Sequence, residues 1–325
     1  MADNLLDKAS ILLTPTAYDN GSMLSIKPTN GDGDFTFSRN GNGSRVNSSG
    51  IIVTEGANLP RINYENGCGS WLLEPQSTNI YLNSETLSTQ NNTTLASTYT
   101  VSFYGTGTIT FSGTHTGSLV GTSLTDRVSA TFTATAGTLT STVTGTVTKG
   151  QLEQQSYATS YIPTLGASST RLQDLASGSG NSTLINSTEG VLYAEIAALA
   201  NSVPTQRLAL SSGNNTNRIY LQFSTTLNRI FVSVVSSSSI VVEMGHTLSN
   251  ITNFNKIAVK YKQDDFALWI NGVEVATDTS GATPLGLSEL AFDDGNGSLP
   301  FYGKTKALAV FPYLTDAELT LLTTI

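Results

Sequence analysis

The chain has 325 residues and a formal net charge of −8; 12% of its residues are charged and 38% are hydrophobic. This length allows two domains and a smaller segment. The acidic balance excludes nucleic acid as an expected partner, because phosphate binding requires a basic stripe. No apolar run is long enough to cross a bilayer and the first residues lack a signal-peptide pattern. We therefore expect no membrane insertion, and synthesis in a cytoplasm without export.

Residues 1–75 are predicted to form a turn-rich N-terminal anchor segment. Its opening leucines fall at helical spacing until Pro15 stops the pattern, which predicts a short helix. Such a helix is marginal in water, so its side chains need a surface from their own domain, from sister subunits or from a larger particle. The predicted anchor or oligomer contacts are Leu5, Leu6, Ile11, Leu12 and Leu13.

Two stretches of this first part carry a family resemblance. FTFSRNGNGSRVNSSGIIVTEGANLPRINYENG, followed by WLLEPQSTNIYLNSE, lies within residues 34–85 and resembles a segment of virion proteins from tailed bacteriophages, particularly fibres and appendages. The opening LLDKASILLTPTAYDNGSMLSIKP is similar to the start of proteins from the crAss-like group of phages. The resemblance implies a structural protein of a head or tail fibre. Its partners would be copies of itself, a trimer being favoured, and other virion proteins.

Residues 76–172 are predicted to form a jelly roll. Apolar residues alternate in YTVSF, ITF and VSATF, and glycine-bearing breaks separate these short strands. The end of this region, QLEQQSYATSYIPTLGASSTR, resembles the close of carbohydrate-binding-module-like jelly rolls in phage virion proteins. Tyr157, Tyr161 and Ile162 in it are predicted to pin a loop to the sandwich; the alternative for these side chains is contact with a ligand. His115 has no partners at metal-ligand spacing and is predicted to be an exposed turn residue.

Residues 173–187 contain Ser-Gly-Ser-Gly-Asn-Ser-Thr and are predicted to be a flexible linker. The last region, residues 188–325, is predicted to be an antiparallel sandwich. In NKIAVKYKQDDFALWINGVEVAT at 255–277, three alternating strands are joined by two tight turns. Its lysines are interpreted as the solvent face of one strand. Thr315 and Glu318 have capping-box spacing, so a short helix is expected over one end of the sheet.

The same region carries a second resemblance. EGVLYAEI, the stretch at 255–277 and GKTKALAVFPYLTDAELTLL resemble the concanavalin-like, laminin-G-like sandwich family. That family includes lectins, glycanases and structural modules, so the resemblance implies a fold and not a function. The expected fold class is all-β: two antiparallel β-sandwich (jelly-roll) domains in tandem behind the N-terminal anchor segment.

No residue set has the pattern of a catalytic centre, so we do not expect an enzyme. The Glu-x-Asp-x-x-Glu pattern of glycosidases on this fold is missing, and neither histidine accompanies a Gly-x-Ser-x-Gly motif. Cys68 is the single cysteine, so there is no disulfide within the chain and no cysteine-based zinc site. No cofactor is expected beyond a calcium ion, which Asp293 and Asp294 could coordinate; the alternative for this pair is a solvated turn.

A host-surface glycan is the predicted ligand. Trp269 alternates with the apolar side chains of its strand, so it faces away from the core, either as a sugar platform or packed beneath a loop or subunit. The predicted carbohydrate contacts are Trp269, Tyr220, Tyr302 and Asn296. The predicted function is that of a structural fibre or appendage subunit of a phage virion, made in the host cytoplasm and contributing to glycan attachment. The alternatives are a stand-alone lectin module and a polysaccharide depolymerase.

Overall fold

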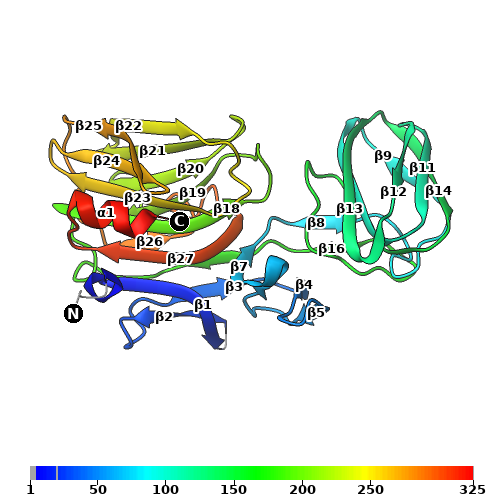
Figure 1. Ribbon diagram of the computed structural model, residues 1–325, viewed down its shortest axis with the longest axis horizontal. Coiled ribbons are helices and arrows are strands. Elements are labelled where there is room, and N and C mark those ends of the chain that lie inside the picture. Colours follow the sequence, from blue (N-terminus) through cyan, green and yellow to red (C-terminus); the bar gives the residue numbers. More distant parts are fainter. Residues whose placement is uncertain (1–4, 20, 325) are drawn as a thin grey trace.

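The computed structural model describes residues 5–19 and 21–324, and its regular structure is almost entirely β. A larger body contains both the N-terminal and the C-terminal parts of the chain, and a smaller body projects from it (Figure 1). The two are joined by the paired strands β8 (Ser77–Asn79) and β16 (Ser169–Arg171). The prediction of an all-β protein with two antiparallel sandwiches is confirmed.

The larger body is a sandwich of an 11-stranded sheet and a five-stranded sheet. The 11-stranded sheet runs in the order β17 (Leu175–Ser177), β3 (Phe35–Ser38), β2 (Ser22–Lys27), β1 (Ile11–Asp19), β27 (Gly303–Phe311), β18 (Glu189–Ala198), β23 (Asn255–Lys262), β24 (Phe266–Ile270) and β25 (Val273–Asp278), with β7 (Ser70–Leu73) and β6 (Ile62–Asn63) attached to β27. The five-stranded sheet runs in the order β22 (Ser239–Thr247), β21 (Arg229–Ser236), β20 (Arg218–Phe223), β19 (Gln206–Ser211) and β26 (Glu289–Ala291).

The core of the larger body lies between these sheets. Every second residue of each central strand points inward, as the period of a strand requires, and is fully buried; examples are Leu192, Val259 and Leu268 opposite Leu208 and Val232. Burial of this continuous apolar layer is the main source of stability. It also fixes the register of the strands, because a slip by one residue would turn the buried face to water.

The antiparallel meander predicted for 255–277 is confirmed. β23 pairs with β24 and β24 with β25. Asn271 and Gly272 adopt φ angles of 50° and 85°, as a type I′ turn requires. The predicted capping box is also present at α1 (Asp316–Thr323): the Thr315 hydroxyl accepts from the backbone N–H of Glu318, whose side chain accepts from that of Thr315. Leu319 of this helix packs on the outer face of the 11-stranded sheet.

The predicted N-terminal anchor helix is wrong. A single turn, η1 (Leu5–Lys8), precedes β1, which pairs with β27 at the other end of the sequence. In this strand Ile11 and Leu13 point into the core while Leu12 packs on the outer face. The apolar residues of this segment also fit the alternation of a strand. Pairing with β27 gives the segment backbone hydrogen bonds within a large sheet, whereas a short helix would be marginal by itself. Five strands of the N-terminal part, β1, β2, β3, β6 and β7, therefore belong to the same sheet as the C-terminal strands, and this part is not a separate front end.

Leu5 and Leu6 also find their partners inside the chain. Both are half-buried and pack against the apolar cluster on the outer face of the 11-stranded sheet. Anchor or oligomer contacts through the five predicted apolar residues are therefore not supported, because each has an intramolecular partner surface.

The predicted linker is likewise packed. β17 pairs with β3, and the buried Ser179 hydroxyl donates to the carbonyl of Gly33 at 2.9 Å. Two of its glycines allow a backbone conformation that other residues rarely adopt: Gly178 and Gly180 have φ angles of 84° and 91°. At Gly180 a Cβ would also approach Cδ1 of Ile11 to 2.9 Å. A composition typical of flexible coil thus serves close packing here.

The smaller body is a second sandwich. One sheet has three strands, in the order β13 (Ser123–Ala134), β10 (Ser97–Gly105) and β15 (Val147–Glu153). The other has four, in the order β12 (Gly117–Val120), β11 (Thr108–Gly113), β14 (Gly137–Thr144) and β9 (Gln90–Thr94). Val101, Phe103 and Leu152 are fully buried between them. Tyr161 and Ile162 are buried, and the Tyr161 hydroxyl lies 2.7 Å from that of Ser84. The prediction that the loop is pinned is confirmed for Tyr161 and Ile162, whereas Tyr157 is half-buried and packs against the core of the larger body.

His115 is not a plain exposed turn residue. Its ring is half-buried and stacks on Phe132, with 4.1 Å between ring centroids and 14° between planes. The residues around His115 could not predict this contact, because Phe132 lies on a different strand, β13.

A buried ionic cluster joins the two bodies where the chain leaves β7 and returns after β16. Asp174 accepts from Arg39 at 3.0 Å and from Arg61, and Arg61 also binds Glu74 at 2.8 Å. Arg171 lies 3.4 Å from Glu74. All five side chains are buried, so each charge depends on its partners for solvation. We call these five residues the neck cluster.

A small hairpin lies next to the neck cluster. Its strands are β4 (Gly43–Val46) and β5 (Ile52–Glu55), and η2 (Glu65–Gly67) follows β6.

Within the described ranges, no helix has the length and apolar content that a membrane span needs.

Candidate functional site

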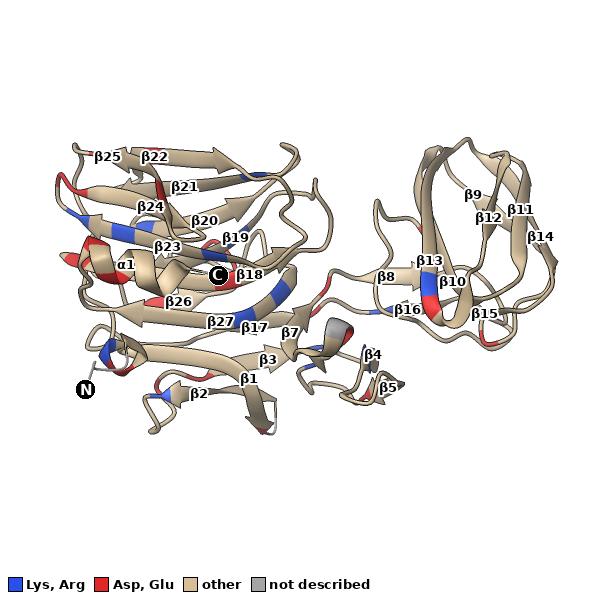
Figure 2. Ribbon diagram, viewed as in Figure 1, with Lys and Arg blue, Asp and Glu red and all other residues tan. Residues whose placement is uncertain are grey.

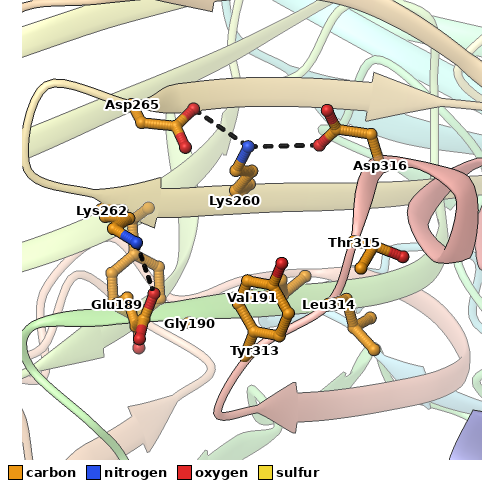
Figure 3. A pocket seen from close by; sticks show the side chains of 11 residues that line it. Glu189, Gly190, Val191, Lys260, Lys262, Asp265, Tyr313, Leu314, Thr315 and Asp316 are labelled. Carbon is orange, nitrogen blue, oxygen red and sulfur yellow. Dashed lines mark hydrogen bonds and ion pairs between the residues drawn. The ribbon is translucent and has the colours of Figure 1, made fainter.

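A pocket of about 240 Å³ opens on the outer face of the 11-stranded sheet, where β18 and β23 run beside the segment that leads into α1. Its side chains come from both strands, from the β23–β24 turn and from the start of the helix (Figure 3). The ones with polar or aromatic groups available to a ligand are Glu189, Lys260, Lys262, Asp265, Tyr313 and Asp316. The larger body carries most of the charged residues, and the lysines of β23 lie near acidic residues at the start of α1 (Figure 2).

Lys260 is the central polar group of this pocket. Its ammonium lies between two carboxylates, 3.0 Å from Asp265 and 3.2 Å from Asp316. Burial of Lys260 disfavours its charge, but hydrogen bonds and charge interactions with both aspartates outweigh this and raise the pKa of Lys260. The side chain is 16% exposed, whereas those of Asp265 and Asp316 are 49% and 63% exposed. The pocket therefore presents a fixed ammonium flanked by two accessible acceptors.

A second ion pair forms one rim. Glu189 and Lys262 are directly opposite each other on β18 and β23, and their charged groups lie 3.2 Å apart. Lys262 is exposed and Glu189 is partly exposed, so the pair contributes little to stability. It is available for reorganisation around a ligand.

Tyr313 supplies the aromatic surface. Its side chain is 54% exposed, the most of any aromatic residue in the described part of the chain. It lies between the end of β27 and the N-cap Thr315, so the strand and the capped helix restrict its backbone on both sides. Figure 3 shows its ring below Lys260, beside Val191. An exposed ring at a fixed place beside polar groups is a typical ligand platform.

The structure covers the tryptophan that the sequence predicts as a platform. Trp269 does face away from the central core, as predicted, but it is only 7% exposed because α1 packs over it with Leu319 and Leu322. The alternative interpretation, packing beneath another segment, is the correct one. The helix supplies the cover, which periodicity within β24 could not reveal.

The two predicted tyrosines are also unavailable as open platforms. Tyr220 is buried on the outer face of the five-stranded sheet, where the Arg207 guanidinium lies 3.9 Å from its ring centroid. Tyr302 is half-buried and donates its hydroxyl to Gln173 at 3.0 Å. The structure brings neither of them to the Tyr313 pocket.

The predicted calcium ligands close a turn. Asp293 accepts from the backbone N–H groups of Gly295 at 2.6 Å and Gly297 at 3.2 Å, and burial raises its pKa. Asp294 lies 3.3 Å from Arg218. Asn296 is exposed at the tip of this loop. The carboxylates are thus engaged in holding the turn, and across the described ranges no three His, Cys, Asp or Glu side chains gather as metal ligands.

Sequence reasoning missed the Tyr313 pocket although it identified parts of it. The predicted turn places Asp265 near Lys260, and the predicted cap at Thr315 places Tyr313 just before a helix. The missing information is long-range: β18 lies between β27 and β23, which brings the helix start to the lysines. Because the lysines were interpreted as a solvated strand face, their proximity to Asp316 at the helix start was not predicted.

No protein-family model matches this chain, and no curated protein sequence matches it. Several solved structures are similar in fold. A sialidase carbohydrate-binding module from Ruminococcus gnavus, bound to sialyllactose, has 16% identity and a TM-score of 0.37 over 45% of this chain and 93% of its own. Domain 4 of an extracellular arabinanase from Geobacillus stearothermophilus, in complex with arabinotriose, has 17% identity and a TM-score of 0.36 over 52% of this chain and 81% of its own. Values this low do not assign a function.

Proposed function

We propose that this chain is a carbohydrate-binding structural protein that holds a sugar unit in the Tyr313 pocket. The observation that carries the proposal is the exposed Tyr313 ring next to Lys260 and its two carboxylates. An ammonium has three donors, of which Asp265 and Asp316 occupy two. The third donor and the free carboxylate lone pairs suit neighbouring hydroxyl groups, while the C–H face of a sugar ring packs on the aromatic ring.

The charge balance of the pocket narrows the class of sugar. Three carboxylates, including Glu189, surround two lysines, so an anionic sugar would meet net repulsion. A volume of about 240 Å³ is smaller than that of typical drug-sized sites and suits one ring. We therefore expect a neutral or amino sugar, bound weakly by one chain and more strongly when several chains act together.

Binding without catalysis fits this pocket best. A glycosidase needs one carboxyl group that stays protonated, usually through burial in an apolar site. Asp265 and Asp316 are instead exposed to water and share one lysine. Incubation of bacterial surface polysaccharide with the protein tests this: we expect no new reducing ends, and their release would favour the depolymerase alternative.

The biological setting in this proposal is a tailed-phage particle. It is supported by the resemblance of residues 34–85 and 151–171 to virion appendage proteins, and by two sandwiches joined through a buried ionic neck. Homo-oligomeric assembly and attachment to the host surface belong to the same proposal. Immunogold labelling of intact particles with antibodies against the chain tests the virion location; absence of label from particles whose lysate contains the protein would contradict it.

The ligand proposal is tested with immobilised bacterial surface glycans, followed by calorimetry with the best binder. We expect Tyr313→Ala and Lys260→Ala to weaken binding at least tenfold. Tyr313→Phe keeps the ring and should bind nearly as well as the unchanged protein. Leu285→Ala, at an exposed apolar residue outside the pocket, is the matched control. Equal affinity of Tyr313→Ala and the unchanged protein would rule out this pocket.

A further inference from the structure

A second and larger cavity, of about 340 Å³, lies at the junction of the two bodies. One wall is the β4–β5 hairpin, which contributes Asn42, Ser44 and Thr54. The other wall comes from the smaller body, through the loop that contains Pro163 and through Ser169 of β16. Cavities between structural units are preferred places for ligands. We call this the neck cavity.

Charge is effectively missing from the lining of the neck cavity. Arg171 is its one charged residue, and that side chain is buried. Its guanidinium donates to the carbonyl of Pro75 at 2.9 Å and lies 3.4 Å from the carboxylate of Glu74. An anionic ligand would find no free positive group, and a cationic ligand no free carboxylate.

The remaining lining is made of hydroxyl and amide groups. Asn42 and Thr54 line the cavity and are exposed. The Ser44 hydroxyl donates to the carbonyl of Tyr161 at 2.5 Å, which leaves its lone pairs as acceptors. Pro163 adds an exposed apolar ring. A purely apolar ligand would leave these polar groups without partners, which is costly.

The two walls are held in place by the neck cluster. Arg61 donates to the carbonyl of Ser44 on the hairpin at 2.9 Å and to the hydroxyl of Ser160 on the smaller body at 2.7 Å. The same guanidinium thus fixes both sides of the cavity. A site that is already organised loses less entropy when it binds.

From these features we propose that the neck cavity binds a neutral, hydroxyl-rich ligand, a saccharide unit, between the two bodies. Amide and hydroxyl groups match the donors and acceptors of such a ligand, Pro163 matches its C–H face, and the uncharged lining selects against acidic and amino sugars. The cavity volume falls within the usual range for small-molecule sites. This site is independent of the Tyr313 pocket and does not rest on the function proposed for it.

Saturation-transfer-difference NMR on the full chain tests the proposal. The probes are lactose, maltose and cellobiose as neutral saccharides, with glucuronic acid and glucosamine as charged ones. The test variant is Asn42→Ala combined with Thr54→Val. The matched control is Asn215→Ala combined with Thr225→Val, the same changes at exposed residues elsewhere. Melting temperatures of both double variants show whether each is folded.

We expect at least one neutral disaccharide to bind, with a loss of tenfold or more in the test variant and none in the control. Tyr313→Ala should retain this signal, which separates the neck cavity from the first pocket. The proposal is overturned if none of the neutral probes binds, if the charged sugars bind equally well, or if the test variant binds like the control. An unfolded test variant is replaced by Thr54→Val alone, with the same criteria.

Discussion

Arg61 and Glu74 face each other at 2.8 Å in the neck of the molecule, and both side chains are buried. Glu74 ends the segment that leads from the larger body, and its other oxygen accepts from the backbone N–H of Ser160 in the smaller body. One carboxylate therefore ties three separate parts of the chain. The neck depends on charges that have no solvent to compensate for a missing partner.

Glu74→Gln should consequently destabilise the fold. Removing one partner of a buried ion pair costs about 3–5 kcal/mol, because the remaining charge stays buried. The amide can still accept from Ser160, so we expect a loss of about 3 kcal/mol in the free energy of unfolding. Urea titration followed by circular dichroism measures it. Glu65→Gln removes an exposed partner of Lys304 and is the control, expected to cost less than about 1 kcal/mol. Equal effects would mean that the neck charges are dispensable.

The same carboxylate predicts a dependence on pH. Burial of Glu74 raises its pKa, but the charges of Arg171 and Arg61 have the larger effect and lower the pKa to about 2. Its pKa in the folded state lies below that of the unfolded chain, so this contribution is complete above about pH 4.5 and disappears as the pH falls toward 2. The free energy of unfolding of the unchanged protein should fall across this range more steeply than that of Glu74→Gln. Parallel curves would contradict the assignment.

Local chemistry made parts of the fold predictable. Asn271-Gly272 specifies a tight turn, and Thr315 with Glu318 specifies a helix start, since each signal is complete within a few residues. Partners distant in the sequence decided the rest. Ile11 is in a strand because β27 is beside it, and the first pocket exists because the same sheet brings Lys260 next to the helix start. Composition misled at Gly180, where glycine permits close packing.

The packed state of the predicted linker can be measured at its two glycines. Both have positive φ, so alanine at either costs about 1–2 kcal/mol in strain. A Cβ on Gly178 meets open space, whereas one on Gly180 would press on Ile11 and Ile185. Overpacking adds about 1–3 kcal/mol, so Gly180→Ala should melt at a clearly lower temperature than Gly178→Ala. A flexible linker would tolerate both changes equally.

The N-terminal strand gives the sharpest choice between an anchor and a core element. Leu13 is fully buried in the core on β1, so Leu13→Ala should lower the free energy of unfolding by about 2–5 kcal/mol. Leu321→Ala, at a leucine that is 68% exposed on α1, controls for the substitution and should have little effect. The mass of the folded assembly by light scattering should not change with either variant, because Leu13 contacts its own chain. If Leu13→Ala kept the stability of the unchanged protein but reduced the mass of the assembly, then the leucines of β1 would serve association between chains, and the pairing of β1 with β27 would need revision.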